Sequence, residues 1–197
     1  MTTTTWPSSL IPQTFSASLK KAGLQFRSPF NGTTQSIDFV AERWIFSLTL
    51  PPKRRSASGQ VEALLFNLAG GIERVRCWHF VRPVPIGTMR GTPTMTSQAV
   101  RGATSLAVTS VSGYTLKAGD VIGAGGQLFM VGADCVTDGS NHITVPIINR
   151  VRATISAAAA VTWDSPTAEF IMPAMQAGVA YRPAILDGVA FDLEEVW

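Results

Sequence analysis

Apolar and polar residues alternate along much of this chain. That period of two indicates β-strands, whose successive side chains point to opposite faces. The segments 13–19 and 43–50 both alternate, and the two prolines that follow Leu50 end the second, because proline cannot donate a hydrogen bond to a sheet. Between the two segments, Asn31-Gly32 marks a tight turn. We therefore expect a mainly β fold.

One segment has helical periodicity instead. Within Ser56–Ala69, apolar residues recur at the spacing that gives a helix one apolar side: Val61, Leu64, Leu65 and Leu68. Serines at the start can cap free amide groups, and Gly70-Gly71 suits a left-handed stop after the last turn. The sequence thus predicts one helix, followed by an alternating strand over 72–81 and a linker rich in proline and glycine over 82–91.

The pattern changes after Gly102. Short β-like runs separated by turn residues fill 103–163, which favours a small barrel or sandwich. Longer alternating segments return after that stretch and end at 191–197. The first 12 residues, dominated by Thr, Ser and Pro, predict a flexible or extended arm.

Composition excludes several classes of protein. Hydrophobic residues make up 46% and charged residues only 15%, against about 25% charged in an average soluble protein, so we do not expect disorder. No stretch reaches the length of a membrane-spanning helix, and the N-terminus lacks the pattern of a secretory signal. A net charge of +3 is a weak argument for nucleic-acid binding. The low charge indicates either a neutral polar surface or a surface covered by partners.

The cysteines and histidines do not form a metal motif. Cys77 and His79 are one residue apart and Cys135 and His142 are six apart, which does not match structural zinc spacing. We interpret the cysteines as buried thiols made in a reducing cytoplasm. We predict no metal, no cofactor and no catalytic residue.

A glycine-rich run and a basic run do not require a binding site to explain them. The glycine-rich run at 123–128 lacks the third glycine of a dinucleotide loop and no helix follows it, so we interpret it as a turn. The run Lys53-Arg54-Arg55 is the densest basic cluster. It suits a solvated connector, salt bridges to a neighbouring subunit, or phosphate contacts.

The layout resembles that of a known family. The segment 42–52 carries an alternating strand with a tryptophan and leads through basic residues to a helix that closes at 68–71. With the small β insertion at 113–122 and 126–131 and the closing segment 191–197, this resembles the distal tail proteins of long, non-contractile-tailed bacteriophages.

The resemblance implies a β-sandwich with one packed helix, formed by 13–102 and 164–197, and an inserted small β-domain at 103–163. It implies a hexameric ring in the virion tail tip that joins the tail tube to the host-recognition hub. The implied partners are tube, hub and tape-measure proteins, with DNA only as cargo in the channel. The chain would be made in the bacterial cytoplasm and would not insert into a membrane.

We assign possible subunit or partner contacts to Lys53, Arg54, Arg55 and Trp6. Two alternatives stay open. The chain could be another tail protein, such as a tube, terminator or hub-associated protein. It could also be a stand-alone binding module for sugar or single-stranded nucleic acid, built on the small β-domain.

Overall fold

The structure is a computed structural model that describes residues 2–196. Met1 of the predicted arm and Trp197 of the predicted closing strand lie outside this range. A six-stranded sheet organises the chain, and all its neighbouring strands are antiparallel except the first pair. Its order is β1 (Thr3–Thr5), β5 (Arg74–Trp78), β14 (Thr167–Ile171), β17 (Val189–Val196), β3 (Thr34–Leu50) and β2 (Thr14–Arg27).

The predicted helix is present but shorter than expected. A 3-10 turn, η1 (Arg55–Ala57), precedes α1 (Gly59–Leu68). The predicted apolar side is buried against the sheet, and it comprises Val61, Leu64, Leu65 and Leu68. Gly70 and Gly71 have φ values of +90° and +68°, which confirms the left-handed stop.

The N-terminal arm is extended, and its own chain fixes it. Strand β1 pairs in parallel with β5, so the predicted arm begins as a strand of the main sheet. The Trp6 indole is 2% exposed, and its Nε1 donates to the Leu10 carbonyl oxygen at 2.7 Å. The same ring packs against Phe80 and Phe191. The expectation that Trp6 meets a partner is therefore wrong, because this apolar side chain fills the core of its own chain.

A second unit is built from short strands in three small sheets. The orders are β12–β7–β6, β10–β9–β13 and β11–β8, and none of these described sheets closes into a barrel. The strands are β6 (Thr94–Met95), β7 (Ser105–Thr109), β8 (Thr115–Leu116), β9 (Val121–Ala124), β10 (Gln127–Met130), β11 (Cys135–Val136), β12 (His142–Pro146) and β13 (Val161–Thr162). We call this the inserted unit.

The core of the inserted unit starts before the predicted boundary at residue 103, which itself stays a prediction. Its buried cluster already includes Met89, Met95 and Ala99. The preceding segment lies very close to this unit, because a Cβ at Gly87 would be 2.2 Å from the Thr115 carbonyl oxygen. Only glycine fits there, so the predicted linker at 82–91 is packed rather than free.

A fourth small sheet completes the fold, which is mainly β with one α-helix among the described residues, as predicted. It consists of β15 (Tyr181–Arg182), β16 (Ile185–Leu186) and β4 (Lys53–Arg54). Leu186 joins this sheet to the same core as α1. The predicted turn at Asn31-Gly32 is also confirmed, since the Ser28 N–H donates to the Thr33 carbonyl oxygen at 2.8 Å.

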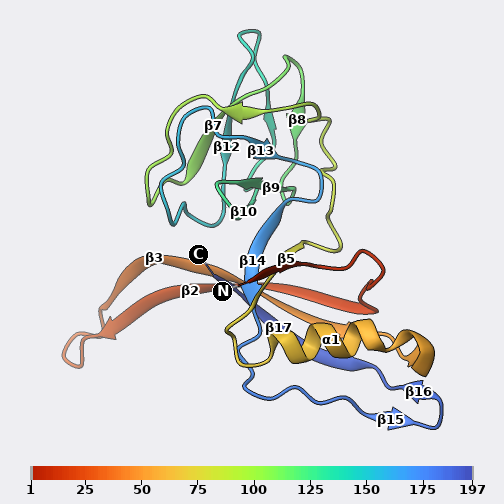
Figure 1. Cartoon of the computed structure of the whole chain (residues 1–197). Coiled ribbons are helices and arrows are strands. Elements are labelled where there is room, and N and C mark those ends of the chain that lie inside the picture. The colour runs from red at the N-terminus through yellow and green to blue at the C-terminus, as the bar shows by residue number, and fades with distance from the viewer. Residues whose placement is uncertain (1, 197) are drawn as a thin grey trace.

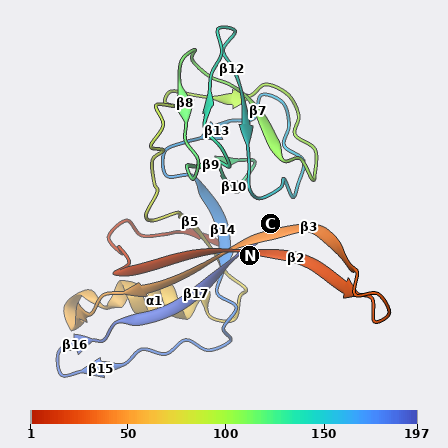
Figure 2. The same ribbon diagram turned by 180° about the vertical axis from the view of Figure 1, so that it is seen from behind.

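The elements are spread unevenly around the main sheet (Figure 1). The inserted unit stands on one side, whereas α1, β15 and β16 lie toward one end. The far halves of β2 and β3 project from the opposite end, and they stand clear of the rest of the molecule in both views (Figures 1 and 2). We call residues 22–39 of this hairpin the ribbon.

Candidate assembly surface

The ribbon has one apolar face that no other described part of the chain covers. Strand register places Ala22 opposite Phe39 and Leu24 opposite Ile37. Directly paired residues share a face, so the two strands build one continuous apolar surface. The large side chains on it are about half exposed, and a phenylalanine at the turn is almost fully exposed: Leu24 52%, Phe26 53%, Ile37 45%, Phe39 47% and Phe30 97%.

The other face of the ribbon is polar. Gln25 pairs with Ser36 and Gly23 pairs with Asp38 on this face. Cations flank the ribbon at both ends, with Lys20 and Lys21 at its base and Arg27 beside its turn. The ribbon is therefore amphipathic, with an apolar face and basic flanks.

Contacts from the inserted unit hold the base of the ribbon. The Arg150 guanidinium pairs with the Asp38 carboxylate at 2.6 Å, and it also faces the buried Glu42 carboxylate at 3.5 Å. Arg101 Nη2 donates to the Val40 carbonyl oxygen at 3.3 Å. A register shift between Lys20 and Ala22 lies at this same point. These contacts fix the direction in which the ribbon leaves the sheet.

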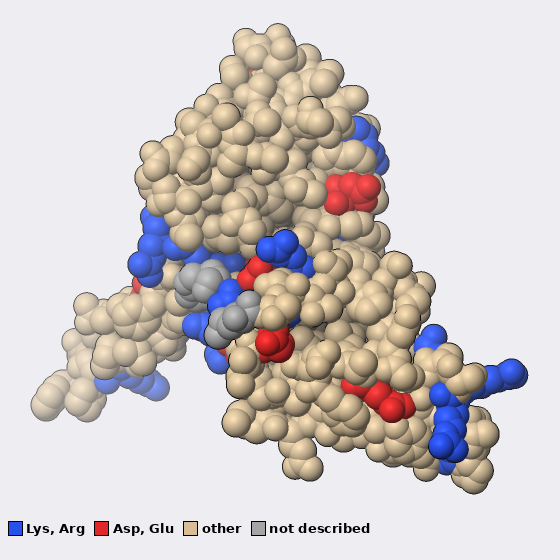
Figure 3. Space-filling view, viewed as in Figure 1, with Lys and Arg blue, Asp and Glu red and all other residues tan. Residues whose placement is uncertain are grey.

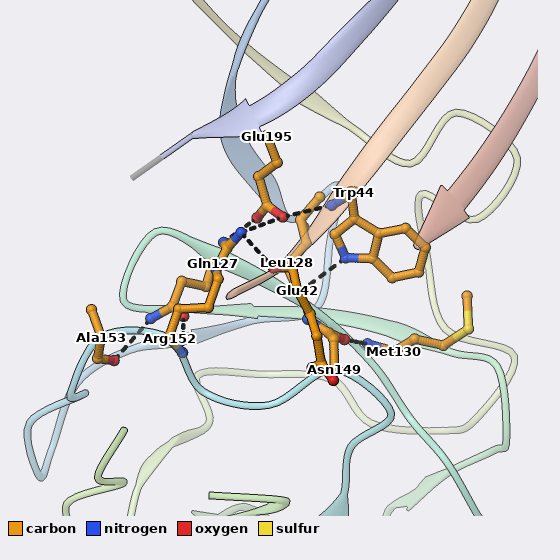
Figure 4. A network of polar contacts seen from close by, with 9 residues as sticks. All are labelled: Glu42, Trp44, Gln127, Leu128, Met130, Asn149, Arg152, Ala153 and Glu195. Carbon is orange, nitrogen blue, oxygen red and sulfur yellow. Dashed lines mark hydrogen bonds and ion pairs between the residues drawn. The ribbon is translucent and has the colours of Figure 1, made fainter. Parts of the chain in front are cut away.

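Behind the ribbon base, a buried ion pair joins the inserted unit to the main sheet (Figure 4). The side chains of Arg152 and Glu195 are 1% and 0% exposed, and two hydrogen bonds connect them, one of them 2.7 Å long. Glu195 Oε2 also accepts the Trp44 N–H at 3.1 Å, and Arg152 Nη1 donates to the Glu42 carbonyl oxygen at 3.2 Å. Burial raises the pKa of Glu195, and the Arg152 guanidinium opposes that rise.

Neutral hydrogen bonds complete this joint (Figure 4). The Trp44 indole Nε1 and the Asn149 amide both donate to the Leu128 carbonyl oxygen, at 3.2 Å and 2.6 Å. Gln127 accepts the Arg152 N–H at 2.9 Å and donates to the Ala153 carbonyl oxygen at 3.0 Å. Such a buried hydrogen-bond network holds two units in one orientation.

An apolar groove lies at the end of the sheet away from the ribbon. It has a volume of about 230 Å³ and lies between α1, residues 172–178 and the start of β17. Leu65, Val189 and Phe191 contribute to its lining, and Asp192 is its one charged residue among those described. The groove thus combines apolar surface with a single carboxylate.

The predicted basic run lies far along the sheet from the ribbon. Lys53 and Arg54 form β4, and Arg55 opens η1. The β15–β16 turn brings Arg182 to the same region, because β16 pairs with β4. The structure does not bring Trp6 to this region.

The cysteines and histidines form no metal centre among the described residues. Cys77 is buried, and burial raises the pKa of its thiol. His79 is also buried, and burial followed by the charge of Arg82 lowers its pKa. Both cysteines are free thiols. No described helix combines the length and hydrophobicity needed to cross a membrane.

No protein-family model matches this chain, and the search of curated proteins finds no match.

Sequence reasoning missed the ribbon, although a signal for it was present. Leu24 and Phe26 alternate with polar residues before the Asn31-Gly32 turn, and Ile37 and Phe39 do so after it. A turn flanked by two alternating runs is typical of a hairpin. The alternation gave no sign that the apolar face lacks a cover.

Proposed function

We propose that this chain is a structural subunit of a bacteriophage tail tip, assembled as a hexameric ring that joins the tail tube to the host-recognition hub. The observation that carries the proposal is the uncovered apolar face of the ribbon. Large contiguous apolar patches on soluble proteins mark interaction sites. The resemblance of the chain to distal tail proteins supports the tail-tip assignment.

The size of the ribbon face fits contact between subunits. An aromatic side chain buries about 150–250 Å². The five exposed apolar side chains of the ribbon therefore offer on the order of 500 Å². A stable interface buries about 800 Å² per partner, so the ribbon supplies most of one side.

A second copy of the chain offers a complementary surface. The groove at the other end of the sheet is apolar and contains Asp192, whereas the ribbon is apolar and flanked by Lys20, Lys21 and Arg27. A contact between opposite ends of identical subunits is head-to-tail, and repetition of such a contact gives a ring when the rotation from one subunit to the next closes. The low content of charged residues agrees with a surface that partners cover.

The alternative of a stand-alone binding module has less support. Modules that bind single strands stack bases on exposed aromatic rings. In the inserted unit Phe129 is 0% exposed, and the Arg90 guanidinium lies 4.9 Å from the centre of the Trp163 ring. Tyr114 is only partly exposed.

Electron microscopy and light scattering of the full chain test the ring. We expect closed rings of about six subunits for the natural chain. The double variant Phe26→Ser with Phe39→Ser should be monomeric while its circular dichroism stays unchanged. The matched control, Gln25→Ala with Ser36→Ala, alters the polar face of the same ribbon and should still form rings. A natural chain that stays monomeric at high concentration would contradict the proposal.

The tail-tip assignment needs a separate measurement. Gold-labelled antibodies against the chain should bind virions at the end of the tail. Label on the capsid, or along the whole tail, would instead indicate a different structural protein.

A further inference from the structure

A second charged surface lies outside the ribbon and its groove. Four cations gather beside the start of α1, at the end of the molecule where β15 and β16 lie (Figure 3). We call Lys53, Arg54, Arg55 and Arg182 the basic patch. The nearby carboxylates are Glu62 and Asp187, and the Asp187 carboxylate pairs with Arg182 at 3.0 Å. Four cations and two carboxylates leave this region with a net charge of +2.

Arg55 stands between two cavities. One has a volume of about 480 Å³ and the other about 420 Å³, and the turn at 183–185 lines both. The turn is held in place, because the Arg55 N–H donates to the Ala184 carbonyl oxygen at 3.0 Å. Ala184 has a φ of +66°, a left-handed conformation that is unfavourable for alanine. The cavities are therefore formed by paired strands and a fixed turn.

The lining combines charge with apolar surface. Tyr181 is 54% exposed and Ile185 42% exposed, and both border the larger cavity beside Arg55. Glu62 borders the same cavity, and hydrogen bonds from Ser58 and Tyr181 lower its pKa, which keeps it a carboxylate. A nucleic acid carries a phosphate on every nucleotide and would place one near the Glu62 carboxylate, whereas a polypeptide can place a neutral N–H there and its own carboxylates at the cations. This difference favours a polypeptide over a nucleic acid.

The ribbon of a second copy does not fit this patch. The ribbon is flanked by Lys20, Lys21 and Arg27, and like charges placed face to face oppose association. A ring built through the ribbon and the groove therefore leaves the basic patch to a different partner.

We propose that the basic patch binds an acidic segment of another protein. Arg55 pairs with a carboxylate of that segment, and Tyr181 and Ile185 contact an apolar side chain next to it. Arginine suits this role because its planar guanidinium binds a carboxylate through two parallel hydrogen bonds. The proposal does not depend on ring formation, since none of these residues belongs to the ribbon or the groove.

Fluorescence anisotropy with the full chain tests the proposal. The probe is a fluorescein-labelled peptide of sequence Gly-Asp-Glu-Leu-Glu-Asp-Phe-Gly. We expect saturable binding that weakens as salt is raised. Arg55→Gln should weaken it about tenfold, and Ile185→Ser should weaken it about threefold. Arg27→Gln removes an exposed cation from the ribbon and should leave binding unchanged.

Three results would overturn the proposal. They are the absence of saturable binding, equal binding of a matched peptide with Asn and Gln in place of Asp and Glu, and unchanged binding by Arg55→Gln. If a single-stranded oligonucleotide binds more tightly than the peptide, and Arg55→Gln abolishes that binding, the ligand of the basic patch is a nucleic acid and the proposal is wrong. The monomeric ribbon variant, Phe26→Ser with Phe39→Ser, should bind the peptide normally, which separates this proposal from that of the ring.

Discussion

Two antiparallel strand pairs with the same alternating pattern have opposite surroundings. In the inserted unit, β7 and β12 pair so that Leu106 faces Val145 and Val108 faces Ile143, and all four side chains are buried. In the ribbon, the equivalent apolar face is about half exposed. The inserted unit has opposing sheets that cover its face, whereas the ribbon extends past the last element that could cover it. This uncovered face is the observation on which the proposed assembly rests.

A first comparison comes from shortening one leucine in each strand pair. Leu106 is 0% exposed and Leu24 is 52% exposed. Leu106→Ala should lower the free energy of unfolding by about 2–5 kcal/mol, because it leaves a cavity. Leu24→Ala should change it by less than about 0.5 kcal/mol. Urea denaturation at a protein concentration where the chain is monomeric measures both free energies, and similar losses would remove the contrast between the two strand pairs.

Two ion pairs allow the same comparison between a buried site and an exposed one, here for charged side chains. Arg152 and Glu195 are fully buried at the joint, whereas the Asp38 side chain at the ribbon base is 54% exposed. Arg152→Gln should lower the free energy of unfolding by about 3–5 kcal/mol, because it leaves the Glu195 charge buried without its partner. Asp38→Asn should lower it by about 0.5 kcal/mol. Thermal denaturation of the two variants, side by side, distinguishes these values.

The last comparison concerns how the free energy of unfolding depends on pH through two glutamates on neighbouring strands. Hydrogen bonds from Arg74, and then from Arg76, lower the pKa of Glu169, whereas burial raises that of Glu195. The stability from Glu169 is present above the usual glutamate pKa of 4.5 and is lost as the pH falls below it. The contribution of Glu195 has the opposite sign and is lost as the pH rises above 4.5.

Glu169→Gln should therefore lower the free energy of unfolding by up to about 1 kcal/mol near neutral pH, and by less in acid. Urea midpoints at about pH 6 and about pH 3.5 measure the difference. A loss that is the same at both pH values would show that the charge of Glu169 does not contribute.

Much of the fold was predictable because its signals are local. The helix stripe at 61–68, the glycine stop after it and the Asn31-Gly32 turn each depend on a few adjacent residues. The glycine-rich run was interpreted correctly as a turn. Strands β9 and β10 pair across Gly125 and Gly126, both with positive φ, as a two-residue hairpin turn requires.

The candidate sites were less predictable because they depend on distant segments. Trp6 carries an apolar ring in a polar arm. No local signal shows that Phe80, just after β5, and Phe191 of β17 pack against this ring. Arg182 joins the basic run only because β16 pairs with β4, more than a hundred residues earlier in the chain. The joint likewise pairs Arg152 with Glu195, 43 residues later in the chain.

The sequence by itself determined that this chain forms strands, where its helix ends and which face of each strand is apolar. Those properties follow from backbone sterics and from the spacing of side chains over a few residues. Only the tertiary structure decided which apolar faces are covered and which charges are buried. Burial depends on segments that meet across the sheet. Glu195 is therefore buried, whereas the apolar face of the ribbon stays exposed to solvent.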